Sequence, residues 1–218
     1  MSKNNHPVDQ GNLFVIAAPS GTGKTTLVKA LVESLPKITV SISHTTRNKR
    51  ASEQHGTNYF FVEFEEFKRM IAEEDFLEHA EIFEHHYGTS KETVSSTLAK
   101  GVDVILEIDW QGHQQIKQLF PDAIGIFILP PSFEDLRSRL IKRNQDHPEI
   151  IKKRLTDAKE TISHLQEFDY VIINDDFSRA LVDLKIIVEA TRLKRTSQHV
   201  RLTQMVQSIS ILPPAADE

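Results

Sequence analysis

One short segment near the N-terminus limits the fold more than any other part of the chain: residues 13–27 read LFVIAAPSGTGKTTL. The apolar run at 13–18 is typical of a strand buried on both faces of a parallel sheet, and Pro19 ends it. Apolar residues at helical spacing predict a helix over 24–35. A buried strand, a glycine-rich turn and a helix in this order are typical of a loop that binds phosphate groups.

The glycine-rich turn fits the pattern G-x-x-x-x-G-K-[ST] except at its first position, which is Ala18. Gly21 and Gly23 let the backbone turn its N–H groups inward, Lys24 supplies positive charge to phosphates, and Thr25 offers a hydroxyl to Mg²⁺. Ala18 needs no positive φ if it still belongs to the strand, so the pattern stays usable. The alternative is a strand-to-helix turn with an incidental lysine.

Three further apolar runs, at 102–109, 123–129 and 169–174, predict buried strands. A helix is expected after Ser132, which would be its N-cap, and a longer one is expected over 178–196. Because strands and helices alternate, the economical fold is a three-layer α/β core around a parallel sheet.

Residues 44–95 interrupt this alternation with an aromatic, charged and strand-rich segment, which predicts an inserted lobe. Strands are expected at 38–43 and 58–64, and a helix over 63–74. The ends of the chain are polar or rich in proline and are expected to be flexible.

Composition narrows the possible partners. The formal net charge is -5 and the sequence pI about 6.1, so binding to nucleic acid is not expected. There are no cysteines, which excludes disulfides and thiolate metal sites. No apolar run approaches the roughly 20 residues of a membrane helix, and the polar N-terminus does not resemble a signal peptide. A cytoplasmic protein without membrane partners is expected.

Two acids end the apolar run at 102–109. Glu107 and Asp109 are two residues apart, so they share one side of the expected strand. Ligands of such folds bind at the carboxyl ends of the strands, where a carboxylate can also help to hold a metal. The alternative is a pair of solvated acids.

The segment HTTRNKR supplies Arg47, Lys49 and Arg50, and tyrosines follow at Tyr59 and Tyr87. Guanidinium groups match phosphate oxygens, so these residues could hold a second phosphate. A short basic cluster is also often a solvated face.

Glu78 lies in an otherwise aromatic and apolar stretch, FLEHAEIF. A carboxylate there can accept from N1–H and the exocyclic amine of guanine, whereas adenine would leave it unpaired. The alternative is a half-buried glutamate paired with a nearby lysine or histidine.

Taken in order, APSGTGKTTL, SHTTRNKR, HGTNYFFV, FLEHAEIFEHHYGTS, DVILEIDWQG, ILPPS and VIINDD resemble guanylate kinase, over about residues 12–196. The resemblance implies ATP + GMP ⇌ ADP + GDP with Mg²⁺, and use of dGMP as a second acceptor. It implies a P-loop kinase core with an inserted GMP-binding lobe and a small helical lid. The corresponding segments are 12–43, 96–133 and 160–207 for the core, 44–95 for the lobe, 134–159 for the lid, and 1–11 and 208–218 for flexible tails.

The resemblance also implies roles for individual residues. The residues expected to hold ATP are Ala18, Pro19, Ser20, Gly21, Thr22, Gly23, Lys24 and Thr25, with Asn174 on the adenine side. The residues expected to contact GMP are Ser43, Arg47, Arg50, Tyr59, Glu78, Tyr87, Thr89 and Asp109. The expected catalytic residues are Lys24, Arg47, Arg139, Arg143 and Arg154, and the expected magnesium contacts are Thr25 and, through water, Glu107.

The chain departs from the family pattern at Lys49, Ser52, Glu107 and Asn144.

Three other functions are weaker alternatives. A binding module that lost catalysis would be expected to lack the loop lysine or the lid arginines, a sugar-phosphate kinase would not need Glu78, and a GTPase switch would need an N-K-x-D run. His85 and His86 are neighbours whose side chains point apart on a strand, so surface or structural roles are expected. The C-terminal helix could support a homo-oligomer.

Overall fold

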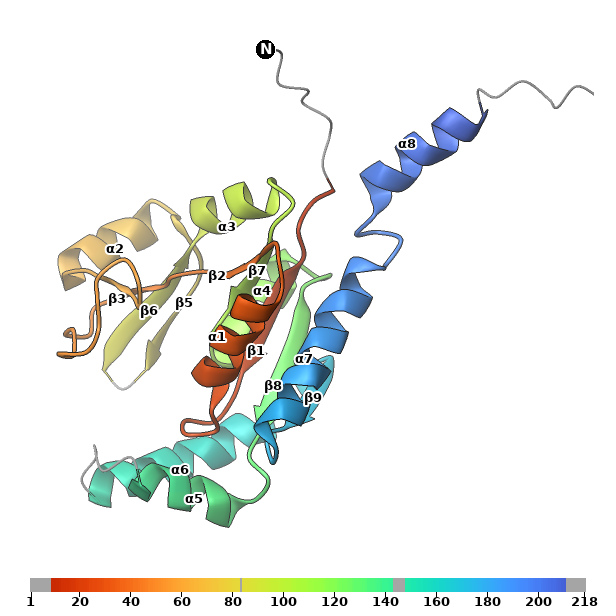
Figure 1. Cartoon of the computed structure of the whole chain (residues 1–218). Helices are drawn as coiled ribbons and strands as arrows, with labels where there is room; N and C mark the ends of the chain where they lie inside the picture. The colour runs from red at the N-terminus through yellow and green to blue at the C-terminus, as the bar shows by residue number, and fades with distance from the viewer. Residues whose placement is uncertain (1–8, 83, 143–147, 211–218) are drawn as a thin grey trace, which may run out of the picture.

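The computed structural model describes residues 9–82, 84–142 and 148–210, and its centre is a five-stranded parallel sheet (Figure 1). The strand order is β2-β7-β1-β8-β9, and every neighbouring pair runs parallel. The strands are β1 Leu13–Ala17, β2 Ile38–Val40, β7 Asp103–Leu106, β8 Ile124–Leu129 and β9 Tyr170–Ile173. The α/β fold with a parallel sheet, predicted from the alternation of strands and helices, is confirmed.

Helices cover both faces of this sheet, and the side chains of β1 show how. Phe14 and Ile16 pack in one apolar cluster with α1 (Lys24–Ser34) and α7 (Phe177–Arg192). Leu13, Val15 and Ala17 point to the opposite face, toward α3 (Lys91–Leu98) and α4 (Trp110–Leu119). Because β1 is buried on both faces, its sequence is continuously apolar.

A second sheet comes from residues 44–90, with strand order β4-β3-β6-β5. Its strands are β3 His44–Thr45, β4 Phe60–Phe61, β5 Phe76–Ile82 and β6 His85–Ser90. The helix α2 (Phe64–Ala72) buries Phe67 and Met70 beside it. Figure 1 shows this sheet beside the main one, across from α5 and α6.

The helices α5 (Phe133–Lys142) and α6 (Pro148–Ser163) form a pair with a small apolar cluster of their own. Ser132 accepts from the backbone N–H of Asp135 at 3.0 Å, which confirms its expected place at the start of α5. After α6, a short 3-10 helix, η1 (Leu165–Glu167), leads into β9.

The expected elements and the observed ones differ in length. The strand expected over 58–64 is only Phe60–Phe61, and the helix expected over 178–196 ends at Arg192. A separate helix that was not expected, α8 (His199–Ser210), follows and points away from the sheets (Figure 1). Asp9 accepts from the N–H groups of Val200 and Arg201 at its start, a contact that local sequence does not indicate.

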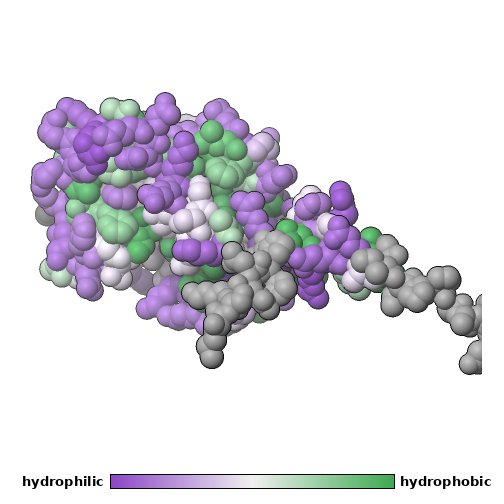
Figure 2. Space-filling view, turned by 90° about the horizontal axis from the view of Figure 1, so that it is seen from above, coloured by the Kyte–Doolittle hydropathy of each residue, from purple (hydrophilic) through white to green (hydrophobic). Residues whose placement is uncertain are grey.

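The projecting helix α8 carries both polar and apolar residues on its surface (Figure 2). Its exposed large apolar residues are Met205, Val206 and Ile209. Of the tails expected at 1–11 and 208–218, residues 1–8 and 211–218 lie outside the described residues. Among the described helices, none is long and apolar enough to cross a membrane.

Candidate active site

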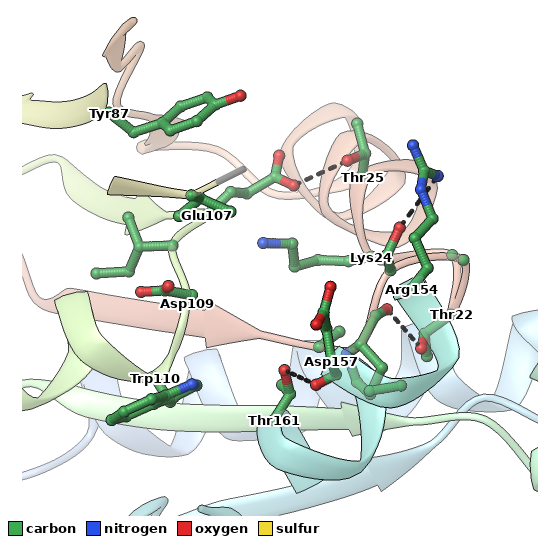
Figure 3. A pocket seen from close by; sticks show the side chains of 18 of the residues that line it. Thr22, Lys24, Thr25, Tyr87, Glu107, Asp109, Trp110, Arg154, Asp157 and Thr161 are labelled. Atoms are coloured by element: carbon green, nitrogen blue, oxygen red, sulfur yellow. Dashed lines mark hydrogen bonds between the residues drawn. The ribbon is translucent and has the colours of Figure 1, made fainter. Parts of the chain in front are cut away.

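A cavity of about 890 Å³ opens where the main sheet, the second sheet and α6 meet (Figure 3). Most of the residues singled out in the sequence line it: Ala18, Pro19, Ser20, Gly21, Thr22, Gly23, Lys24, Thr25, Ser43, Arg50, Tyr59, Glu78, Tyr87, Glu107, Asp109, Arg139, Arg154 and Asn174. Arg47 and Thr89 are not among the lining residues, although both contact residues that are. Arg143, and Asn144 beside it, lie outside the described residues.

The glycine-rich turn needs its two central glycines. Gly21 and Gly23 have φ of 93° and 100°, and a Cβ at Gly23 would lie 2.7 Å from Nδ2 of Asn174. Ala18 directly follows β1, has no positive φ and packs against the core. The expectation that this position does not need glycine is confirmed.

Side chains from distant parts of the chain hold the turn in place. The carbonyl oxygen of Thr22 accepts from Nδ2 of Asn174 at 2.7 Å and from Nη1 of Arg139 at 3.0 Å. Arg139 also donates to the carbonyl oxygen of Asn174, at 3.0 Å. Both residues therefore order the turn in this structure.

Charged groups cluster at the start of α1. The side chain of Lys24 extends between Glu107 and Asp109 (Figure 3). Burial lowers the pKa of Lys24, and the two carboxylates act in the opposite direction. Thr25 Oγ1 donates to Glu107 Oε2 at 3.0 Å, so the two expected magnesium contacts lie together. Asp109 caps α4 by accepting from the N–H of Gly112 at 2.9 Å.

Glu78 is buried, with 4 % of its surface exposed. Thr89 lies opposite it in the β5–β6 pair and donates to Oε1 at 2.5 Å. Burial raises the pKa of Glu78 to about 7; the bond from Thr89 lowers it and the charge of Asp109 raises it. In the structure the side chain of Glu78 pairs with Thr89, and not with the lysine or histidine of the alternative.

The second oxygen of this carboxylate lies close to the backbone of α4. A Cβ at Gly112 would lie 2.7 Å from Oε2 of Glu78. Gly112 is the last residue of the DVILEIDWQG segment, yet no local pattern in that helix indicates contact with β5.

The basic cluster is ordered by an acid that sequence reasoning missed. Glu53 accepts from Nη2 of Arg47 at 2.7 Å and from the backbone N–H of Arg50 at 2.8 Å. The guanidinium of Arg47 also lies 5.6 Å from the ring centre of Tyr59. Tyr59 and Tyr87 make an edge contact at 5.9 Å. Arg47 is therefore packed rather than solvated, whereas Lys49 and Arg50 are exposed.

The helix α6 brings further residues to the cavity. Nη1 of Arg154 lies 3.4 Å from Oγ of Ser20, within the glycine-rich turn. Asp157 and Thr161 follow one and two turns later and also line the cavity, as does Trp110 at the start of α4. These three were not singled out in the sequence. The helical spacing of Asp157 and Thr161 from Arg154, at i+3 and i+7, is the signal that could have found those two, whereas Trp110 directly follows Asp109 in the sequence.

Comparison with known proteins agrees with this geometry. The sequence profile of the guanylate kinase family matches residues 10–191. The guanylate kinase of Coxiella burnetii is 52% identical over 202 residues, which cover 93% of this chain and 98% of that protein. The guanylate kinase of Hahella chejuensis is 56% identical over 192 residues, covering 88% and 92%.

A solved structure gives the same result. The crystal structure of guanylate kinase from Anaplasma phagocytophilum superposes with a TM-score of 0.77 at 32% identity, and covers 94% of this chain and 98% of that one. The fold, the site and the sequence matches over nearly the whole chain agree: this chain belongs to the guanylate kinase family.

Proposed function

We propose that the cavity holds ATP on the glycine-rich turn and GMP on the second sheet, and that the chain transfers the γ-phosphoryl group of ATP to GMP. The observation that carries this proposal is that Lys24 and Glu78 line one cavity. One group suits a phosphate and the other suits a guanine base, so a single site can bring donor and acceptor together.

On the donor side, the turn from Ala18 to Thr25 holds the phosphates of ATP. Its N–H groups and the positive end of the α1 dipole face the anion, and Lys24 adds a full charge. The carboxylates of Glu107 and Asp109 favour the charged form of Lys24. Asn174 lies on the adenine side and also keeps the turn in shape through Thr22.

On the acceptor side, Glu78 accepts from N1–H and the exocyclic amine of guanine, and Thr89 and Ser43 contact the same base. Arg47, Arg50, Tyr59 and Tyr87 hold the GMP phosphate. Glu53 already orients Arg47, so little side-chain entropy is lost when the phosphate binds. Asp109 also lies against GMP.

The residues present fit a magnesium ion. Thr25 and Glu107 offer oxygen ligands within hydrogen-bond distance of each other, and Mg²⁺ prefers oxygen ligands with several retained waters. Residues 9–82, 84–142 and 148–210 contain no group of three acidic or histidine side chains able to hold a metal alone. We infer that Thr25 would hold the ion directly and that Glu107 would hold it through water. The ion neutralises charge on the transferring group.

Phosphoryl transfer requires alignment and charge neutralisation from the protein. An oxygen of the GMP phosphate attacks the γ-phosphorus while the bond from that phosphorus to the β–γ bridging oxygen breaks, which leaves ADP and GDP. The attacking oxygen is already ionised near neutral pH, so no general base is needed. Arg139, Arg143 and Arg154 close on the transferring group and exclude water, because open access would permit hydrolysis of ATP.

The division of the chain follows the same proposal: residues 12–43, 96–133 and 160–207 form the core, 44–95 bind GMP and 134–159 form the lid. The use of dGMP, a cytoplasmic location, the absence of nucleic-acid and membrane partners, and assembly into a homo-oligomer stay predictions.

The proposed reaction is tested by ADP release, with GMP, dGMP, AMP, UMP and ribose bisphosphate each offered as the acceptor. We expect release with GMP and dGMP and little with AMP or UMP, since neither offers the paired donors that Glu78 requires. Activity confined to ribose bisphosphate would contradict the proposal and indicate a sugar-phosphate kinase.

A further inference from the structure

Three side chains on one face of α4 contact the segment that joins α6 to β9. Trp110, Gln114 and Lys117 are spaced i, i+4 and i+7, so they share that face. Trp110 stacks on His164, Gln114 donates to Glu167 at 2.9 Å, and Lys117 pairs with Asp169 at 2.9 Å. We call these three contacts the α4 clamp.

The contact nearest the cavity is the stack of Trp110 on His164. The rings of Trp110 and His164 are 3.6 Å apart between centroids and 5° from parallel. Nδ1 of His164 lies 2.6 Å from Oε1 of Glu167, and Oε2 of the same carboxylate accepts from Gln114. Burial acts to raise the pKa of Glu167, but the bonds from His164 and Gln114 outweigh it, and the pKa is lowered. Glu167 therefore stays ionised and fixes the His164 ring against Trp110.

The clamp lies where α6 changes its packing partners. Leu155 and Ala158 belong to the small cluster shared with α5. Ile162 and Leu165 instead pack against the apolar cluster of the main sheet. The end of α6 near His164 thus packs against the core, whereas the apolar residues in the part that carries Arg154 pack against α5, and Arg154 itself reaches Ser20 of the glycine-rich turn. A helix held in this way can turn about its held end.

We propose that Trp110 and His164 are positioning residues, and that their stack is the fixed end about which the α5–α6 pair turns to place Arg154 at the transferring phosphoryl group. This inference rests on the proposed function, in which Arg154 contacts that group. Arg154 is ten residues before His164, about 15 Å along a helix, so a small turn at the stack moves it substantially. Trp110 also directly follows Asp109 (Figure 3), so the stack lies next to a residue on the acceptor side of the cavity.

The kinetic test uses Trp110→Leu and His164→Ala, with Trp110→Phe as the conservative variant that keeps a flat ring. Loss of a positioning contact of this kind is expected to lower kcat about tenfold while KM for GMP stays within about twofold. Trp110→Phe should retain most activity, and the double variant should be no worse than either single change, because both remove one contact.

The matched control is His79→Ala. His79 is an exposed histidine whose backbone N–H and carbonyl oxygen bond to Gln115 of α4, so we expect replacement of its side chain to leave kcat unchanged. Thermal unfolding accompanies each assay. Unchanged kcat in both clamp variants, a loss that merely follows the fraction unfolded, or a raised KM for GMP with kcat retained would each overturn the inference.

Fluorescence tests the fixed end directly, because Trp110 is the only tryptophan in the chain. A stacked imidazole quenches indole emission, so His164→Ala should brighten it. If the stack is a fixed end, the brightening is the same fold-change without ligands and with ADP plus GMP. Brightening only without ligands would show that the stack opens on closure and would overturn the inference. A wild-type enzyme that releases no ADP with GMP would instead contradict the proposed function.

Discussion

The two halves of the cavity recognise their ligands in different ways. The glycine-rich turn offers backbone N–H groups and one lysine, and its shape is held by Asn174 and Arg139 acting on the carbonyl of Thr22. The second sheet offers side chains, above all the buried Glu78 and its partner Thr89. Backbone donors bind any polyphosphate, whereas a buried carboxylate accepts only a base with matching donors. Backbone donors thus bind the phosphate donor without selecting its base, whereas the buried carboxylate selects the base of the acceptor.

The largest effect should come from the donor half. Lys24→Ala removes the one full positive charge of the turn, and we expect turnover to fall by about 10³-fold or more. The fold should be retained, because Lys24 is desolvated and costs stability rather than adding to it. Steady-state ADP release measures turnover, and circular dichroism measures whether the fold is retained. Robust activity in this variant would remove the turn from the mechanism.

The next effect should be confined to the acceptor half. Glu78→Gln keeps the size of the side chain but replaces one acceptor by a donor that faces the donors of guanine. We expect kcat/KM for GMP to fall about 10²-fold, with binding of ATP changed little. Titration calorimetry with each nucleotide measures the binding of GMP and of ATP separately. An equal loss for ATP and GMP would show that Glu78 serves the structure rather than the base.

A smaller effect should follow from Gly112→Ala. The added methyl would lie 2.7 Å from Oε2 of Glu78 and must displace that carboxylate. Alanine is the better helix former by about 1 kcal/mol, so stability should hold or rise. We expect KM for GMP to rise about tenfold while KM for ATP is unchanged. A variant with wild-type KM for GMP would mean that the position of this carboxylate is not critical.

The smallest effect should be the change in KM for GMP as the carboxyl group of Glu78 titrates with pH. Because the pKa of Glu78 is raised to about 7, its carboxylate loses ionisation as pH falls through that value. Between pH 8 and pH 6.5, KM for GMP should rise about fourfold from this group alone. Glu78→Gln is the control: it lacks this component but shares the titration of the GMP phosphate itself. Identical pH profiles for the two proteins would contradict the assignment.

The same pKa affects the stability of the ligand-free protein. The folded-state pKa of Glu78, about 7, exceeds the ordinary value of 4.5. Its favourable contribution is therefore fully present below pH 4.5 and is lost as pH rises through 7. Relative to Glu78→Gln, the wild type should become less stable across that window in urea unfolding.

The donor half could be predicted from sequence because its determinants are adjacent. Residues 13–27 specify the strand, the turn and the helix, and even Ala18 could be placed correctly. Asn174 and Arg139 were expected to contact the nucleotide, but their bonds to Thr22 depend on β9 and α5 meeting the turn. The local sequence of the turn does not indicate these contacts with distant elements.

The acceptor half was predictable in its residues but not in its geometry. Glu78 and Thr89 were both singled out, yet their pairing depends on the β5–β6 register. Glu53 and Gly112 were missed because the first acts through Arg47 and the second through the approach of α4. The helix α8 was missed because its start is capped by Asp9, from the other end of the chain.

The central claim is that Glu78 selects the acceptor through the paired donors of guanine. The most direct test is the ratio of kcat/KM for GMP over that for IMP, whose base lacks the exocyclic amine but keeps N1–H. In the wild type we expect a ratio of about 10². In Glu78→Gln the ratio should fall toward one, because the glutamine cannot accept from both donors. A ratio that stays at the wild-type value in Glu78→Gln would contradict the claim.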